Sequence, residues 1–455
     1  MPDTIRHRRC RRAHAAHEPV AATSGKTLNP ENPADFAPGR QRSATPRTRF
    51  RRGADTVSSR QAKLHPTIAL AEDTMKIATS RSMVLAIAVS LVGMACSRPA
   101  ETGTVQEAAA AMETVDDAEV GARFVDAMQQ HGISGAQLAH VRDGVLREYV
   151  HGVVGDAGSA KVDARTTFEA ASLSKVVGAY IALRLVDQGL IDLDTPLREY
   201  WRSPRIGDAD PASAITARMV LNHTTGLPNW QISPSDPAID DTHLESLFAP
   251  GGRFAYSGEG FYLLQKTLEH VSGLSWNALA EREVFAPLGM PDSSFLTRSA
   301  PTADNAYGHD RDGSTRKARV FGWENTAWTL VTNADDYSRF VQRALFAGEG
   351  LAPATHAMML AQSSDADDRA LPTPADPFIA WGLGVGLQQT EARKLVWHWG
   401  DNPGFKALFV LDPQSGESLV LFTNSENGLS TYREMLQLFL GEGAYPLVEW
   451  ARTQS

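Results

Sequence analysis

Cysteine is nearly absent from this chain of 455 residues, which contains only Cys10 and Cys96. The body of the protein therefore has no disulfide framework and no thiolate cluster for a metal. Histidine offers no substitute, because the 13 histidines include no His-x-His or HExxH arrangement. We expect no metal and no cofactor, and a core that is stabilised by packing alone.

Most of the chain also has no excess of basic over acidic residues. Residues 1–74 carry 14 Lys and Arg against 7 Asp and Glu, whereas the remainder carries 30 against 46. Nucleic-acid binding depends on clustered Lys and Arg that contact phosphates. The acidic body therefore predicts no nucleic-acid partner.

The apolar run from Met83 to Ala95 is too short to span a bilayer, which takes roughly 20 residues. It follows two basic residues and ends at Cys96, which is the layout of a secretory leader. Residues 75–96 resemble a bacterial lipoprotein signal in which Cys96 would be lipidated, although Gly93 stands where such signals usually have Leu. We expect export to the periplasm, with membrane attachment through that lipid; a buried core helix is the alternative.

Composition divides the rest of the chain into three parts. Residues 1–74 are rich in Arg, Pro, Ala and Ser, and we interpret them as a non-native extension ahead of a true start at Met75, or as a disordered basic tail. Residues 97–115 are rich in Ala, Glu and Thr and predict a linker. One folded domain is predicted over residues 116–445.

Hydrophobic periodicity predicts an α+β fold for this domain. Residues 116–131 have helical spacing, and two apolar runs split by Asp143-Gly144 predict a β-hairpin. Near the other end, the runs LVWHWG, FKALFVL and SLVLFTN predict strands, and TYREMLQLFL predicts a final helix. We expect an antiparallel β-sheet built from both chain ends and flanked by helices, with an all-helical region inserted between them.

Two long helices are predicted inside the domain. One begins near Ser172 and ends at Gly189, and the other begins at Phe261 and ends at Gly273. The stretch 363–376 is rich in Asp and Pro and predicts an exposed loop.

The first of these helices carries a candidate nucleophile. A serine hydroxyl needs a base beside it and donors for the developing oxyanion. Ser172 and Lys175 are three residues apart, which on a helix gives a Cβ separation of about 5–6 Å on one face. The same spacing at Ser314 and Lys317 falls in a charged turn, which we interpret as solvated surface. For Ser172 itself, a helix N-cap is the alternative.

Two further segments complete the candidate site. Tyr256-Ser257-Gly258 precedes an apolar helix, and a lysine beside the tyrosine would favour the phenolate. His398-Trp399-Gly400 places a polar ring in a strand-like run. Taken singly, the tyrosine could be a packed aromatic and the histidine a satisfied core residue.

Together, Ser172-x-x-Lys175, Tyr256-Ser257-Gly258 and His398-x-Gly400 resemble the motifs of the serine β-lactamase and penicillin-binding-protein family. That family includes cephalosporinase-type enzymes, D-alanyl-D-alanine carboxypeptidases and related esterases. The likeness extends through segments such as LVDQGLIDLDTPLREYW, ITARMVLNHTTGLPNW and EVFAPLGMPDSSF, so it covers about residues 116–445.

The resemblance implies a role for each residue. Ser172 would be the acylated nucleophile, Lys175 and Tyr256 the proton-transfer pair, and His398 the substrate-facing member of the third motif. The oxyanion hole would consist of the backbone N–H groups of Ser172 and Asp401. Substrate binding is implied for four further positions, Ser257, Gly258, Trp399 and Gly400.

Two departures from the family bear on the substrate. Gly258 stands where β-lactamases usually carry an Asn for the substrate amide, and His398 where they usually carry a Lys for the substrate carboxylate. A neutral imidazole binds a carboxylate less well than an ammonium does. We expect ester hydrolysis with weak or absent β-lactam turnover, and a D-amino-acid peptide stays open as a substrate. The segment His223–Pro228 is interpreted as a structural turn.

The sequence also bears on two other classes of protein, a lipase-type hydrolase and a non-catalytic binding protein. A lipase-type hydrolase would carry Gly-x-Ser-x-Gly, which does not occur in this sequence. A non-catalytic penicillin-binding or cell-wall-binding protein with the same fold is the alternative to an enzyme. The expected partner is in either case a small molecule or a cell-wall peptide.

Overall fold

The computed structural model describes residues 117–455 except 157, 298–303 and 318. The predicted extension, leader and linker, with Cys96, lie outside the described residues. The chain divides into two compact units, and every described residue falls in the second, Ala100–Ser455. None of the described helices combines the length and the apolar character that crossing a bilayer requires.

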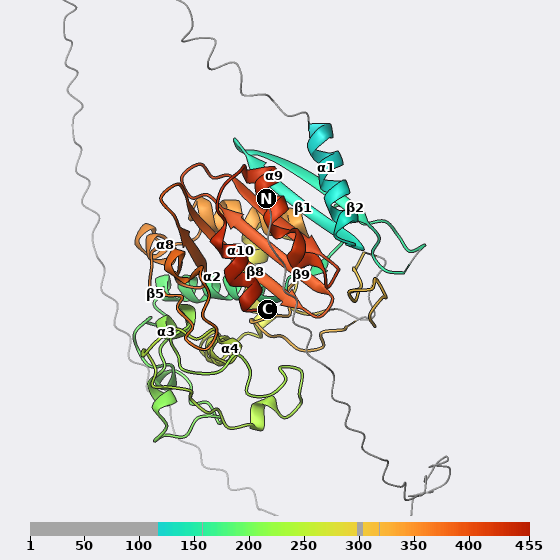
Figure 1. The fold of residues 1–455 in the computed structure, drawn as a ribbon. Coiled ribbons are helices and arrows are strands. Elements are labelled where there is room, and N and C mark those ends of the chain that lie inside the picture. The colour runs from blue at the N-terminus through green and yellow to red at the C-terminus, as the bar shows by residue number, and fades with distance from the viewer. Residues whose placement is uncertain (1–116, 157, 298–303, 318) are drawn as a thin grey trace, which may run out of the picture. The chain divides into compact units, whose positions relative to one another are not determined.

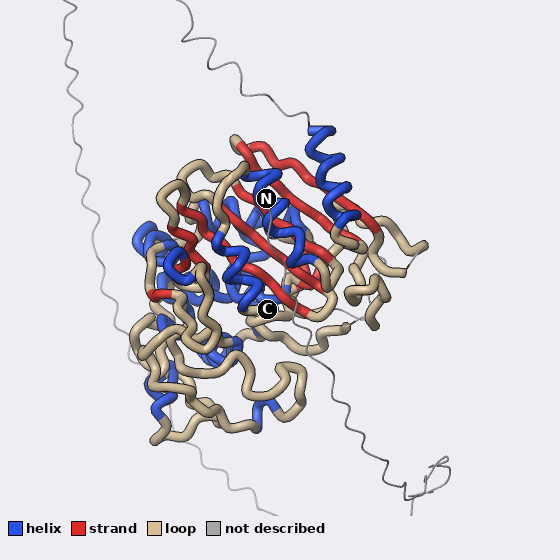
Figure 2. Tube along the Cα trace, in the orientation of Figure 1, coloured by secondary structure: helices blue, strands red, loops and turns tan. Residues whose placement is uncertain are grey.

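An eight-stranded antiparallel sheet forms the centre of the fold (Figures 1 and 2). Its strands lie in the order β2-β1-β10-β9-β8-β7-β6-β5, so the first hairpin pairs with the last strand of the chain. The strand bounds are β1 Gly135–Arg142, β2 Val145–Gly152, β5 Ser364–Asp365, β6 Ile379–Trp381, β7 Gly386–Gln389, β8 Lys394–Asn402, β9 Phe405–Leu411 and β10 Ser418–Thr423. A separate pair joins β3 Phe168–Glu169 to β4 Val331–Thr332.

Helices cover both faces of the sheet (Figure 1). The helix bounds are α1 Asp117–Gln130, α2 Ser174–Asp187, α3 Ala217–Leu221, α4 Gly258–Ser272, α5 Trp276–Ala280, α6 Ala286–Leu288, α7 Ala334–Phe340, α8 Pro353–Leu360, α9 Tyr432–Leu440 and α10 Pro446–Thr453. Along β9, Leu408 and Val410 pack in one core cluster with α1, α9 and α10, whereas Ala407 and Phe409 pack in another with α2 and α7. Alternate side chains point to opposite faces of a strand, so a strand with both faces covered is apolar throughout.

The observed elements match the predicted hairpin and C-terminal strands closely. The second long helix begins at Gly258 and not at Phe261, and the predicted loop 363–376 contains the short edge strand β5. Asp143 and Gly144 both have positive φ, 52° and 72°, which is the conformation of a two-residue turn between antiparallel strands. Gly189 and Gly273 follow their helices in the left-handed conformation, as the sequence predicts. The fold continues past the predicted end at residue 445, because α10 packs on the sheet through the buried Trp450.

The inserted region contains more loop than an all-helical region would (Figure 2). Between α2 and α4, the described α-helical structure is limited to the short α3, and the remainder consists of loops and 3₁₀ turns. Side-chain hydrogen bonds fix these loops; Asp192, for example, accepts from the backbone N–H groups of Asp194 and Thr195. Proline and such local bonds compete with helix formation.

Candidate active site

Ser172 lies in a 3₁₀ turn, Ala171–Leu173, that continues directly into α2; we call it the nucleophile turn. Ala171 has a φ of 49°, a left-handed conformation that residues other than glycine seldom adopt. The turn is fixed by Ser174, whose hydroxyl donates to the Ala171 carbonyl and accepts from Leu330 N at 3.0 Å. Ser172 is half-buried between two buried neighbours, so the fold presents its hydroxyl at a strained turn, as is frequent at functional sites.

Lys175 lies one turn further along and faces the nucleophile, as the spacing predicts. Its Nζ is 3.0 Å from Ser172 Oγ and donates to the Ala327 carbonyl at 2.9 Å. The side chain is 2% exposed, and burial lowers the pKa of this amine to about 7. A large share of the molecules therefore holds a neutral amine near pH 7, with its lone pair available to the Ser172 hydroxyl.

Tyr256 lies against this amine, with Lys175 Nζ 4.8 Å from the centre of the phenol ring. Burial raises the pKa of the phenol above its ordinary value, and the neighbouring Ser172 hydroxyl opposes this only weakly. The expected phenolate is therefore not supported, because desolvation is the largest effect on the pKa of this phenol. Tyr256 stays protonated and can act as a proton donor.

His398 also points into this group, from β8. Its ring centre is 6.2 Å from that of Tyr256, and its Nδ1 donates to the Trp399 carbonyl at 2.7 Å. The ring is fully buried, and burial lowers its pKa to about 3, with a smaller contribution from the charge of Lys175. The imidazole is therefore neutral, and its Nε2 is an acceptor and not a cation for a substrate carboxylate.

The edge of β8 lies beside the nucleophile turn. Strand β7 pairs with β8 only as far as Trp397. Beyond it, a Cβ added at Gly400 would lie 2.5 Å from the Ala170 carbonyl oxygen and 3.1 Å from Ala171 Cβ, so only glycine allows this approach. The Asp401 carboxylate pairs with Lys406 at 2.8 Å. The N–H groups of Ser172 and Asp401 remain the predicted oxyanion hole.

Gly258 is covered by an indole. A Cβ added at this position would lie within 3.0 Å of three ring carbons of Trp230. The loop that carries Trp230 is held against α4, because both the carbonyl and the side-chain oxygen of Asn229 accept from Gly258 N, at 3.1 and 3.0 Å. Trp230 thus occupies the space that an Asn side chain at position 258 would need.

The side chains of Ser257 and Trp399 are engaged in the fold. Ser257 Oγ donates to the Pro228 carbonyl at 2.8 Å and accepts from Gly260 N at 2.9 Å, capping α4. The Trp399 indole donates to Ser455 Oγ at 3.1 Å and is 2% exposed. Because both side chains have hydrogen-bond partners within the fold, only the backbone atoms of these two residues are available for the predicted substrate contacts.

His223 contacts the site, although the sequence suggested only a structural turn there. The turn itself is present, since Gly226 has a φ of 76° and an added Cβ would meet the Phe248 carbonyl. The His223 ring centre is 4.4 Å from that of Tyr256, and its Nδ1 accepts from Ser257 N at 3.1 Å. Burial lowers the pKa of this imidazole, with smaller effects from Lys175 and His398. His223 thus packs against the Tyr256 ring and binds the backbone N–H of the next residue.

The sequence also did not predict a buried ion pair next to Gly258. Glu259 is fully buried and accepts from Arg205 through both carboxylate oxygens, at 2.7 and 3.1 Å, and from Gln231 N at 3.0 Å. Gln231 follows Trp230, so the pair fixes the loop over Gly258. A Glu immediately after Tyr256-Ser257-Gly258 was the available signal, but its partner lies 54 residues away.

The second Ser-x-x-Lys match is a surface turn, as predicted. Ser314 is exposed and its hydroxyl donates to the Asp312 carboxylate at 2.6 Å. Lys317 is exposed as well.

Comparison with known proteins supports the relationship suggested by the motifs. The Beta-lactamase family profile matches residues 120–440, well over half of the chain. The chain belongs to this family.

Two curated relatives of this beta-lactamase-family chain are penicillin-binding proteins. Penicillin-binding protein 4 of Amycolatopsis lactamdurans is 25% identical over 351 residues, which cover 72% of this chain and 90% of that protein. Penicillin-binding protein 4* of Bacillus subtilis (strain 168) is 23% identical and covers 66% of this chain and 69% of the relative.

Solved structures share the fold. SurE is 26% identical with a TM-score of 0.62, covering 72% of this chain and 76% of that one. The D-amino acid amidase from Ochrobactrum anthropi SV3 is also 26% identical, with a TM-score of 0.56 over 68% and 93% of the two chains. A class C beta-lactamase, 18% identical with a TM-score of 0.61 over 73% and 99%, shows the fold alone. The expected antiparallel sheet with flanking helices is thereby confirmed.

Proposed function

We propose that this protein is a serine hydrolase that cleaves carboxylic esters through an acyl-enzyme on Ser172. The observation that carries the proposal is the 3.0 Å contact between Ser172 Oγ and the buried Lys175 amine, whose pKa burial lowers to about 7. General base catalysis works best with a pKa near the working pH, and such catalysis contributes about 10²–10⁴-fold in rate.

The proposed reaction starts with the neutral amine. Lys175 accepts the Ser172 proton while Oγ attacks the ester carbonyl carbon, and the N–H groups of Ser172 and Asp401 bind the oxyanion. The protonated Tyr256 gives its proton to the departing alkoxide and recovers one from the Lys175 ammonium. Water then attacks the acyl-enzyme, releasing the carboxylic acid and restoring Ser172.

Trp230 and His398 support an ester over a β-lactam. The indole over Gly258 leaves no space for an amide-binding side chain, and the buried neutral His398 supplies no cation for a carboxylate at that point. We infer that β-lactam turnover is weak or absent.

Two reagents test this proposal on the full chain. A fluorophosphonate should label Ser172, and p-nitrophenyl butyrate should be hydrolysed with a kcat/KM at least about 10³-fold above that of Ser172→Ala. Ser314→Ala is the matched control, because it alters the same motif in an exposed turn and should retain full label and activity.

A chromogenic cephalosporin assayed in parallel separates the substrate classes. Turnover comparable with that of the butyrate ester would overturn the substrate assignment. Absence of both label and hydrolysis would favour the non-catalytic binding protein.

Hydrolysis of D-amino-acid amides is the second candidate, favoured by the 26% identity to the D-amino acid amidase. A D-phenylalanine amide that is cleaved faster than both its L enantiomer and the butyrate ester would make it the leading activity.

A further inference from the structure

The two N–H groups of the predicted oxyanion hole come from separate segments of the chain. Ser172 belongs to the nucleophile turn, and Asp401 lies near the end of β8. The segments approach each other closely, because a Cβ added at Gly400 would lie 2.5 Å from the Ala170 carbonyl oxygen. A misplacement of a catalytic group by about 1 Å can cost about 10²-fold in rate. The contacts that hold the end of β8 against the nucleophile turn therefore bear on catalysis.

A buried hydrogen bond joins residues that flank these two segments. Asn402 follows Asp401, and its Nδ2 donates to the Glu169 carboxylate at 2.7 Å. Glu169 is the last residue of β3 and precedes Ser172 by three residues. Both side chains are buried. A hydrogen bond to a carboxylate that is shielded from water is among the stronger ones, so it links the end of β8 firmly to the segment that enters the nucleophile turn.

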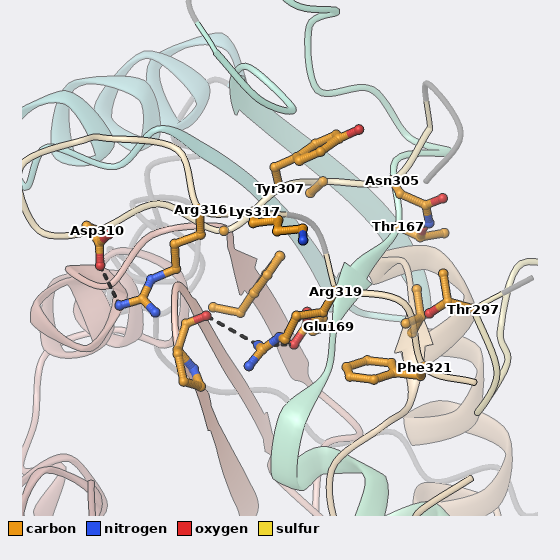
Figure 3. Close-up of a pocket in the computed structure, with 15 residues that line it drawn as sticks. Thr167, Glu169, Thr297, Asn305, Tyr307, Asp310, Arg316, Lys317, Arg319 and Phe321 are labelled. Atoms are coloured by element: carbon orange, nitrogen blue, oxygen red, sulfur yellow. Dashed lines mark hydrogen bonds and ion pairs between the residues drawn. The ribbon is translucent and has the colours of Figure 1, made fainter. Parts of the chain in front are cut away.

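Glu169 is fixed in turn by Arg319. This guanidinium donates to both carboxylate oxygens, and at 3.3 Å to the Pro403 carbonyl in the turn between β8 and β9. The pair lies in the wall of a cavity of about 410 Å³, where Arg319 is the more exposed partner (Figure 3). The charge of Arg319 offsets the unfavourable burial of the carboxylate. Arg319 therefore holds the acceptor of the Asn402 hydrogen bond in place.

Asn402 also bonds to the segment that carries a partner of the catalytic amine. Its Nδ2 donates to the Trp328 carbonyl at 3.3 Å. The preceding carbonyl, that of Ala327, accepts from the Lys175 amine at 2.9 Å. The Asn402 amide thus connects the end of β8 to the segment before Ser172 and to the segment that binds Lys175.

We propose that Glu169 and Asn402 are positioning residues that set the spacing between the Ser172 and Asp401 N–H groups. The inference rests on the proposed ester hydrolysis and adds to it two residues that do not touch the substrate. Loss of the bond between them lets the end of β8 move away from the nucleophile turn, while the contact of Ser172 with Lys175 stays. The oxyanion is then bound less well, and the ester itself is bound as before. The expected signature is a lower kcat with an unchanged KM.

Asn402→Ala tests this on the full chain with p-nitrophenyl butyrate. We expect kcat to fall about tenfold to fiftyfold, less than the roughly 10²–10³-fold that follows removal of an oxyanion donor, with KM within about twofold of the wild type. Butylboronic acid forms a tetrahedral adduct on a serine hydroxyl and so resembles the transition state. Its inhibition constant should rise by about the same factor as kcat falls.

An exchange of the two groups provides the rescue. Asn402→Asp places a second carboxylate against Glu169, and it should lower kcat at least as far as Asn402→Ala does. The double variant Glu169→Gln, Asn402→Asp again pairs one amide donor with one carboxylate acceptor, with the same number of side-chain atoms. It should recover most of the lost kcat. Because these variants are isosteric with the wild type, they decide the question even where Asn402→Ala does not fold.

Asn333→Ala is the matched control. Asn333 is another buried asparagine that donates to a carboxylate, that of Asp292, at 3.1 Å. Its loss should lower the thermal midpoint and leave kcat and the inhibition by butylboronic acid unchanged. A general loss of stability is thereby separated from a displaced oxyanion donor.

Two results overturn the positioning role. One is a kcat of Asn402→Ala equal to that of the wild type, and the other is a loss in Asn402→Asp that Glu169→Gln does not relieve. In both cases the proposed hydrolysis stands, provided that the wild type is labelled by a fluorophosphonate and cleaves the butyrate ester. A wild type that does neither overturns the proposed function and the positioning role together.

Discussion

At the scale of single residues, the protonation states of Lys175 and Tyr256 decide the chemistry. Helical spacing alone predicts that Lys175 faces Ser172, because side chains three apart share a face. The protonation states depend on how deeply each group is buried, which no local pattern records. The sequence therefore led to a phenolate at Tyr256, whereas burial raises the pKa of that phenol and lowers the pKa of Lys175, the base of the proposed reaction.

The pH dependence of ester hydrolysis follows from the Lys175 pKa of about 7. Below that pH the amine is protonated and cannot accept the Ser172 proton, so kcat/KM should fall about tenfold per pH unit and level off above about pH 8. A pH–rate profile between pH 5 and 9 with p-nitrophenyl butyrate measures this. A profile that stays flat through pH 6 would contradict Lys175 as the base.

The same residue should give a pH-dependent stability. The pKa of Lys175 is about 7 in the fold against an ordinary 10.5, so between these values the unfolded chain holds the extra proton and a rise in pH favours folding. Relative to Lys175→Met, the wild type should gain about 1.4 kcal/mol of unfolding free energy per pH unit in that window. Urea unfolding at pH 7, 8 and 9 measures the difference.

Lys394→Met is the control for this measurement, because its amine is exposed in the fold. Its unfolding free energy should follow that of the wild type with no added slope. A Lys175→Met difference that does not change with pH would mean that the lysine is not desolvated.

At the scale of elements, the strands were predictable and the close approaches between them were not. Alternating apolar runs and the Asp143-Gly144 turn specify β1, β2 and β8–β10 locally. The contact of Trp230 with Gly258 joins a loop to a helix across 28 residues, and the approach of Gly400 to Ala170 joins strand to turn across 230. Sequence marks such glycines only as small residues, since their neighbours come from the tertiary fold.

The contact between the Trp230 loop and α4 gives a prediction of its own. Gly258→Asn should lose about 1–3 kcal/mol of stability, because its side chain meets the indole. The double variant Trp230→Ala, Gly258→Asn should lose less stability than the sum of the losses in the two single variants. Of the three variants, only the double variant should turn over a chromogenic cephalosporin faster than the wild type. A double-mutant cycle of urea unfolding measures the coupling.

Gly207→Asn is the matched control for this cycle. Gly207 is exposed, and a Cβ added there would meet nothing within 4 Å. It should be nearly neutral, alone and combined with Trp230→Ala. Additive effects of the Gly258 and Trp230 changes would contradict the packing described.

At the scale of the whole molecule, the site depends on both ends of the described chain. Ser172 and Lys175 come from the first third of the described residues, and His398 comes from β8 near the end. The sheet that holds them closes only when β10 pairs with β1. The sequence predicted this closure, but it placed the end of the domain at 445 because the short α10 has a weak local signal.

Two truncations test this organisation. A chain of residues 116–455 should keep its kcat/KM for p-nitrophenyl butyrate and its thermal midpoint, because both core clusters lie within it. A chain that ends at 445 should lose more than about 3 kcal/mol or fail to fold, since it removes Trp450 from its contacts with Trp381, Trp397 and Trp399. Circular dichroism melts of the two chains measure both outcomes.

The pairing of β1 with β10 also sets an order of events during biosynthesis. A chain leaving the ribosome carries Ser172 and Lys175 long before β8–β10 have been made, and strands that meet only across the full length of the sequence assemble slowly. The nascent protein should therefore stay inert toward esters until its last strands have emerged, so that hydrolysis begins only with a finished molecule.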